Sequence, residues 1–191
     1  YPNSNIGSYS NLNIYFGTGG SSGNGTIYTE LPNAVFACGD YRYGQLGTNI
    51  LQSDSSTNTK PIQINNLLNS NIVAISGGRD HSLFLDSNGK VYSCGVNNTG
   101  KLGRTTTTTI NSISADSNIK QIDLTNIVAI SAANSASLFL DSNGKVYSCG
   151  YNYYGQLGRT GNNLIPQQIT SNISNCNIVA ISAGGYHSLF L

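Results

Sequence analysis

The sequence predicts an all-β fold, a β-propeller of about 3.5 four-stranded blades, and three observations lead to this prediction. The first is a short β-rich string, V-[FY]-[AS]-C-G, which occurs at Val35–Gly39, Val91–Gly95 and Val146–Gly150. The second is the string I-V-A-I-S, which occurs at Ile72–Ser76, Ile127–Ser131 and Ile178–Ser182. The third is the period of both strings. A period of roughly 55 residues is typical of propellers and solenoids, in which each unit buries its apolar faces against its neighbours.

One repeat unit contains four short segments with the character of strands. After Val35–Gly39 come a glycine loop and a polar stretch, Thr48–Lys60, which we expect to be an exposed loop. Pro61–Ile64 alternates apolar and polar residues and predicts a second strand, whose proline suits an edge or a strand start. Ile72–Ser76 is mostly apolar, so we expect a central strand there. His81–Asp86 is the fourth strand.

A tight hairpin connects each unit to the next. The string D-S-N-G-K separates two apolar runs, and Asn-Gly in such a place is a strong hairpin signal. The alternative fold, a parallel β-helix, has shorter coils and needs no such hairpin. Asp86 and Asp141 open this string, and we expect them to be turn residues, because the remaining ligands of a calcium loop are missing.

The units divide the chain into segments of one partial propeller domain. We expect three full repeats, at residues 34–90, 91–145 and 146–191. Residues 1–33 read as a degenerate half repeat, because Asn13–Gly20 and Thr26–Glu30 have the spacing of the last two strands of a later unit. The sequence thus predicts two strands followed by three sets of four, fourteen in all.

The composition argues against several classes of protein. Only 9% of the 191 residues are charged, against roughly 25% in an average domain, and the net charge is +1. This balance gives no strong signal for nucleic acid or for an anionic membrane, and no apolar run approaches the length of a membrane span. Asn24, Asn97 and Asn172 match the glycosylation acceptor pattern, but chance matches are expected in so polar a chain.

The loop after the first strand of each unit carries a recognisable pattern. It reads C-G-D-Y-R-Y-G-Q-L-G, C-G-V-N-N-T-G-K-L-G and C-G-Y-N-Y-Y-G-Q-L-G. Together with G-G-R-D-H-S and A-G-G-Y-H-S, it resembles the repeat of the regulator of chromosome condensation family, over about Ala34 to Leu191. The resemblance implies a propeller that usually has seven blades. About three and a half blades cannot close such a ring, so we expect the rest from a longer chain or from other subunits.

The resemblance also implies a range of functions. The founding member of the family is a nucleotide-exchange factor for a small GTPase and binds chromatin, whereas many relatives are protein-interaction or regulatory modules. This chain departs from the family pattern in two ways. The usual tryptophan is replaced by Cys38, Cys94 and Cys149, and the usual histidine is Ala136 in the middle unit.

The repeated residues have a physical role that follows from their type. We expect positive φ or close backbone approach at the loop glycines, which are Gly44, Gly47, Gly100, Gly103, Gly155 and Gly158. The leucines between them should fill the gap between adjacent blades; these are Leu46, Leu102 and Leu157. His81 and His187 should hydrogen-bond backbone near the central channel. They have no acidic or cysteine partner in register, so we expect no metal site.

The inventory of reactive residues favours binding over catalysis. The chain has one Glu, Glu30, and two His, and it has no P-loop or dinucleotide fingerprint. We therefore expect no catalytic residue and no cofactor, and we interpret the chain as a non-catalytic protein-interaction module or scaffold. Loops rich in Tyr and Asn suit contact with a partner. The candidate contact residues are Tyr41, Arg42, Tyr43, Asn97, Asn98, Tyr151, Tyr153 and Tyr154.

Two alternative functions stay open. A guanine-nucleotide exchange factor for a small GTPase works by inserting a loop and needs no acid–base residues. It predicts a protruding wedge loop, and no insertion in the sequence stands out as one. A structural component of an extracellular or viral assembly is the other alternative, suggested by the low charge and the loops rich in Tyr and Asn.

Overall fold

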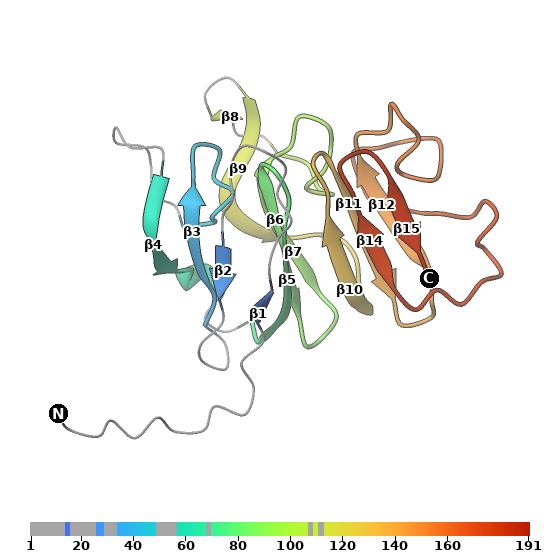
Figure 1. Ribbon diagram of the computed structural model, residues 1–191, viewed down its shortest axis with the longest axis horizontal. Coiled ribbons are helices and arrows are strands. Elements are labelled where there is room, and N and C mark those ends of the chain that lie inside the picture. The colour runs from blue at the N-terminus through green and yellow to red at the C-terminus, as the bar shows by residue number, and fades with distance from the viewer. Residues whose placement is uncertain are drawn as a thin grey trace.

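The computed structural model describes residues 14–15, 26–28, 34–48, 57–67, 70–106, 109–110 and 113–191. These residues form four antiparallel sheets that stand side by side in chain order (Figure 1). The first sheet contains β1 (Ile14–Tyr15), β2 (Thr26–Tyr28), β3 (Phe36–Asp40) and β4 (Thr57–Gln63), and a short 3-10 helix follows at Asn65–Leu67. Among the helices of the described segments, none is long and apolar enough to cross a membrane.

The other three sheets repeat this order with variations. The second sheet contains β5 (Ile72–Gly77), β6 (His81–Asp86), β7 (Val91–Val96), β9 (Ile113–Gln121) and β8 (Thr109–Ile110). The third contains β10 (Ile127–Ala132), β11 (Ala136–Asp141), β12 (Val146–Gly150) and β13 (Gln167–Gln168). The fourth contains β14 (Ile181–Ala183) and β15 (Ser188–Phe190). The described chain therefore forms about three and a half propeller blades.

The sheets are out of phase with the sequence repeats. The D-S-N-G-K hairpin pairs β6 with β7 in one sheet, with Leu83 opposite Ser93. Asp86 Oδ1 accepts hydrogen bonds from the backbone N–H groups of Asn88 and Lys90, at 2.9 and 2.8 Å, so it is a turn residue as predicted. A sequence unit such as 34–90 therefore contributes its first two strands to one blade and its last two strands to the next.

Three sequence-based expectations about strands were wrong. The polar stretch Thr48–Lys60 is not all loop, because residues 57–60 belong to β4, where Thr57 pairs with Asp40; residues 49–56 lie outside the described part. The strand at Ile72–Ser76 is not central but lies at the edge of its sheet. A bulge at Val73 leaves this side chain 46% exposed. The described residues also contain fifteen strands, because β8 adds a strand outside β9.

Each hydrophobic core lies between two consecutive sheets. The first joins Ala37 of the first sheet, and Leu46 of the loop that follows β3, to Phe84 and Cys94 of the second sheet. The next two clusters join the second sheet to the third and the third to the fourth in the same way. Packing of each sheet only against its neighbours is the property that the repeat period predicts.

Candidate protein-interaction site

The loops that follow β7 and β12 share one hydrogen-bonded scaffold. In the first of them, Asn97 Nδ2 donates to the backbone oxygen of Arg104 at 2.7 Å, while its Oδ1 accepts from the backbone N–H of Leu102 at 2.9 Å. Asn152 makes the two equivalent bonds in the next loop, at 2.7 and 2.8 Å. These side chains replace backbone partners, so they hold each loop in one conformation.

The first glycine of two of these loops lies against the next blade along the chain. Gly100 has φ +85°, and a Cβ added there would lie 2.5 Å from the Cα of Leu164. Gly44 has φ +76° and is equally close to Ser117. Gly155 has φ +77°, but no described atom lies within 4 Å of such a Cβ. The leucines of the same motif are all buried, namely Leu46, Leu102 and Leu157.

Two arginines that the sequence analysis did not single out anchor these loops. Arg104 donates from Nε and NH2 to the hydroxyl and backbone oxygen of Ser93, at 3.1 and 3.0 Å, and from NH1 to Asp116 at 3.1 Å. Arg159 makes the same two bonds to Ser148, at 3.0 and 2.6 Å. Each arginine directly follows the repeated Gly-x-Leu-Gly, which was the signal that could have identified them.

A serine hydroxyl joins every pair of consecutive sheets. In each case it donates at 2.7 Å to the backbone oxygen of the residue between Gly and Leu in the preceding loop, in the pairs Ser82–Gln45, Ser137–Lys101 and Ser188–Gln156. The loop of one blade is therefore fixed to the second strand of the next blade.

His81 is completely buried. The prediction that its side chain hydrogen-bonds to backbone was wrong, because its partner is a serine hydroxyl. Its Nε2 lies 2.9 Å from the hydroxyl of Ser137 on the next blade, and its Nδ1 has no hydrogen-bond partner among the described residues. Burial, and then the neighbouring Lys101 ammonium, hold the pKa of His81 well below its usual 6.5, so this ring is neutral. His187, at the same position of its repeat, is exposed.

Lys101 is a buried cation in a position that glutamine occupies in the other two loops. Its side chain is 2% exposed, and its Nζ lies 3.9 Å from a carboxylate oxygen of Asp80. Burial lowers the pKa of Lys101 from 10.5 to about 8, although Asp80 opposes the shift. Gln45 and Gln156 instead accept a backbone N–H within their own loops, at 2.9 and 3.0 Å.

The described residues offer little chemistry for catalysis or metal binding. They contain no group of three or more His, Cys, Asp or Glu side chains that could hold a metal ion. Cys94 and Cys149 are buried between sheets, and burial raises the pKa of both thiols to about 12. Such thiols are protonated at neutral pH and unreactive. Cysteine at the family's tryptophan position is thus a core residue in these two blades.

Two candidate contact residues have structural roles instead of forming an exposed contact surface. Tyr41 is nearly buried and belongs to the first hydrophobic core. Both ends of the Asn97 amide hold the loop scaffold. Asn98 is exposed, and Arg42 lies over the Tyr43 ring, with 5.8 Å between its Cζ and the ring centroid. Asn24 lies outside the described residues, and Asn172 is exposed.

The remaining candidates, Tyr151, Tyr153 and Tyr154, form one aromatic group with Tyr186, which the sequence analysis did not single out. These four residues are here called the tyrosine patch. Ring centroids lie 6.3 Å apart between Tyr151 and Tyr153, 5.0 Å between Tyr153 and Tyr154, and 5.1 Å between Tyr154 and Tyr186. The exposed fractions are 78% for Tyr153, 62% for Tyr154 and 55% for Tyr186. Tyr186 lies in the turn before β15, so the patch spans the third and fourth sheets.

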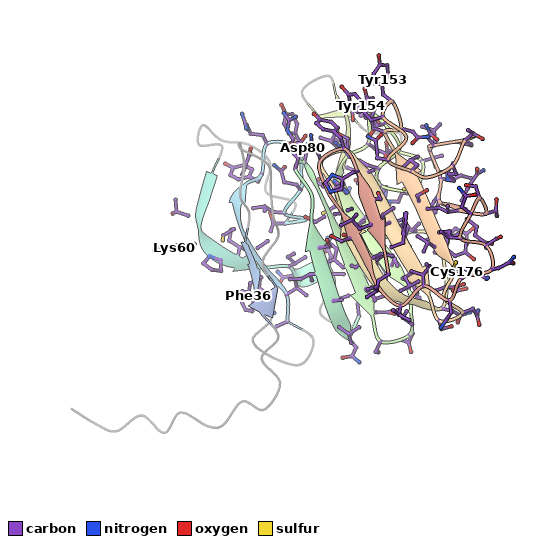
Figure 2. The ribbon with its side chains drawn as sticks, turned by 45° about the vertical axis from the view of Figure 1, so that its right-hand side comes forward. Phe36, Lys60, Asp80, Tyr153, Tyr154 and Cys176 are labelled. Carbon is purple, nitrogen blue, oxygen red and sulfur yellow. The ribbon has the colours of Figure 1, made fainter. Side chains whose placement is uncertain are left out.

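The tyrosine patch lies at one end of the sheets. Figure 2 shows Tyr153 and Tyr154 at the same end as Asp80, with Phe36 toward the other end. We call this end the loop face; it consists of the loops after β3, β7 and β12 and the turns before β6, β11 and β15. An open depression of about 480 Å³ adjoins the patch there. Its described lining is Thr99, Gly150, Tyr151, Asn152, Tyr153, Thr160, Gly161 and Asn163.

Comparisons with known sequences identify the repeat. One model of the regulator of chromosome condensation (RCC1) repeat matches residues 33–85 and 143–191. A second model of the same repeat matches residues 72–101 and 127–156. The X-linked retinitis pigmentosa GTPase regulator of dog is 32% identical over 146 residues, which are 72% of this chain and 13% of that protein. The probable E3 ubiquitin-protein ligase HERC4 of mouse is 32% identical over 167 residues, which are 84% of this chain and 15% of that protein.

Solved structures share the fold. Prp20p of Saccharomyces cerevisiae superimposes with a TM-score of 0.80 at 23% identity, over 92% of this chain and 42% of that one. Human WBSCR16 gives a TM-score of 0.73 at 24% identity, over 87% and 44% of the two chains. The chain thus spans less than half of these propellers and a small part of the curated relatives. The matched repeat models and the relatives at 32% identity show that the chain belongs to the regulator of chromosome condensation (RCC1) repeat family.

Proposed function

We propose that this chain is a non-catalytic protein-interaction module whose loop face contacts a partner protein through the tyrosine patch. The observation that carries the proposal is the exposure of Tyr153, Tyr154 and Tyr186 as one contiguous group. Aromatic side chains bury a large area with few rotatable bonds, so they are enriched in protein interfaces. A contiguous group of exposed aromatic side chains is more typical of a binding surface than of a surface that only contacts solvent.

The scaffold under the patch supports the same proposal. The backbone N–H of Tyr154 donates to Gln156 Oε1 at 3.0 Å, that of Tyr151 donates to the backbone oxygen of Ser135 at 2.8 Å, and Asn152 closes the loop. The tyrosines are therefore presented on a backbone that is already fixed, which lowers the entropy lost on binding.

The known proteins with this fold add support from their partners. The yeast Prp20 structures were described with binding to Gsp1p and histones and in a complex with Kap60, so this fold binds proteins in yeast. Identity to these chains is below 25%, so the identity of any partner does not transfer to this chain.

A photo-crosslinking amino acid at position 153 tests the proposal. The matched control carries the same amino acid at Asn88, an exposed residue in the β6–β7 turn at the opposite end of the second sheet. In extract from the source cells we expect a discrete protein adduct from position 153 and none from position 88. Adducts from position 88 alone, or equal adducts from both, would contradict a partner on the loop face.

A second function, exchange of guanine nucleotide on a small GTPase, has one specific observation in its favour. The β8–β9 hairpin adds a fifth strand outside the second sheet, an addition that the sequence did not reveal as an insertion. One relative is also named as a GTPase regulator. Release of fluorescent GDP from loaded small GTPases tests this function. Faster release of GDP in the presence of the chain would support exchange activity. Unchanged release would contradict exchange activity, and the interaction module would then be the function that the structure supports.

A further inference from the structure

The tyrosine patch and the adjoining depression have a composition that narrows the chemistry of the partner. None of the described residues that line the depression is charged: they are tyrosine, threonine, asparagine and glycine. Arg159 lies beside this lining, but it donates to the backbone oxygens of Thr160 and Asn162 and to Ser148. The site therefore offers aromatic rings, hydroxyl groups and amides without a carboxylate to hold a cation.

We propose that the tyrosine patch binds an uncharged, proline-rich segment of a partner protein in the polyproline II conformation. The inference rests on the proposed function and specifies the partner for the same surface. Proline-rich segments bind to grooves lined by aromatic side chains, and their extended conformation is already formed before binding, so little entropy is lost.

The spacing of the rings suits such a segment. Tyr153, Tyr154 and Tyr186 follow one another with ring centroids 5.0 and 5.1 Å apart, and their planes are steeply inclined to each other, at 86° and 64°. Edge-to-face rings leave ridges and notches rather than a flat surface. A polyproline II helix advances about 9 Å in each turn of three residues, so one turn matches the reach of this row.

Hydrogen-bonding capacity points to the same ligand. A run of prolines has no backbone N–H and presents carbonyl acceptors alone. The tyrosine hydroxyls, together with the hydroxyl of Thr160, can donate to such carbonyls. A cationic segment would instead stack on the faces of the rings, and the arginine–glycine peptide in the test below separates this binding mode from that of proline. One carboxylate of the loop face, that of Asp80, already faces Arg79 and Lys101.

The neighbouring loop provides a natural control. Asn98 and Thr99 occupy the places of Tyr153 and Tyr154 on the same scaffold, one blade earlier. The double variant Tyr153→Asn with Tyr154→Thr therefore exchanges the patch for side chains that this scaffold already carries. The variant Asn98→Ala alters an exposed tip outside the patch.

Titration with an acetylated, amidated octaproline peptide, followed by amide chemical shifts, tests the proposal. A glycine–serine peptide of equal length, an arginine–glycine peptide and a neutral oligosaccharide serve as comparison ligands. We expect saturable binding of octaproline with a dissociation constant of roughly 0.01–1 mM, weakened at least about tenfold in the double variant and unchanged in Asn98→Ala. The affinity should change little with salt, since no charges meet.

Three results would overturn the proposal: no saturable shift with octaproline, equal binding of the glycine–serine peptide, or tighter binding of the arginine peptide or the oligosaccharide. The crosslink at position 153 distinguishes this failure from failure of the proposed function. If the adduct forms and octaproline neither binds nor competes with it, the loop face binds a partner of other chemistry. If no adduct forms, the proposal that the loop face binds a partner protein fails as well.

Discussion

The junction between the second and third sheets differs from the junction between the third and fourth, although both are built from the same repeat. At the first junction His81 is buried against Ser137, and Gly100 contacts the backbone of Leu164. At the second, Ala136 takes the place of His81, and Gly155 has no described neighbour within 4 Å. The fourth sheet has two described strands, where the third has four.

The difference shows which interactions belong to a loop and which depend on the following blade. The asparagine scaffold and the inter-sheet serine bond are present at both junctions, since Ser188 still donates to Gln156. The buried histidine is present only at the first junction, and the close contact of the first loop glycine is seen only there, where the segment before an outer strand of the next sheet covers Gly100. The exposed second junction is also where the tyrosine patch lies.

The largest effect should come from the paired substitutions Gly100→Ala and Gly155→Ala. Both residues have positive φ, which costs an alanine about 1 kcal/mol. Only at Gly100 does the new Cβ also collide with backbone, so we expect a loss of about 3 kcal/mol or more there. Urea denaturation of the two variants gives the comparison. Equal losses would show that contact with the next blade does not distinguish the two glycines.

The next effect concerns His81 and His187. Replacement of His81 by Ala should lower the free energy of unfolding by about 2–3 kcal/mol, because it empties a buried site, whereas His187→Ala should change it by less than about 0.5 kcal/mol. Thermal denaturation of both variants at neutral pH checks this expectation.

His81 should also make the free energy of unfolding depend on pH. Because the folded pKa of His81 lies well below 6.5, the unfolded chain binds the proton first as pH falls. The stability from this residue is therefore present above about pH 6.5 and is lost below it. The loss should be smaller in His81→Ala and should persist in His187→Ala. A similar acid profile in all three proteins would rule out the buried neutral ring.

A smaller effect should follow from Lys101→Gln. The buried ammonium has a pKa of about 8 in the folded chain against 10.5 when unfolded, so its burial is unfavourable below pH 8 and the penalty fades as pH rises to 10.5. Glutamine removes the charge and can accept a loop N–H, as Gln45 and Gln156 do. We expect a gain of about 1 kcal/mol at pH 7 that shrinks by pH 10. A variant less stable than the parent at pH 7 would contradict this reading of Lys101.

Much of the fold was readable from the sequence because each strand carries its own signal. The V-Y-S-C-G and I-V-A-I-S strings lie in or overlap strands, and the Asn-Gly turns form the hairpins that they predict. The phase of the sheets was not predicted: the four strands of one unit were interpreted as one blade, whereas the hairpin that joins two units places its strands in one sheet. The β8 strand had no such signal, because a threonine run has strand propensity without an apolar alternation.

The site was less predictable because it depends on contacts one period apart. His81 reaches Ser137, 56 positions later, and no local pattern identifies that partner. Tyr186 joins Tyr154 across a blade boundary, and in the other repeats its place is taken by Asp80 and Ser135. The candidate tyrosines were found from composition, but their grouping, and the burial of Tyr41, needed the three-dimensional arrangement.

The most direct test compares binding and stability in the Tyr153→Asn, Tyr154→Thr double variant. Both side chains are exposed and the scaffold bonds use other atoms, so the free energy of unfolding should stay within about 0.5 kcal/mol of the parent. Affinity for the crosslinked partner should fall at least about tenfold. Unchanged affinity in a stable variant would show that the tyrosine patch is not the binding surface.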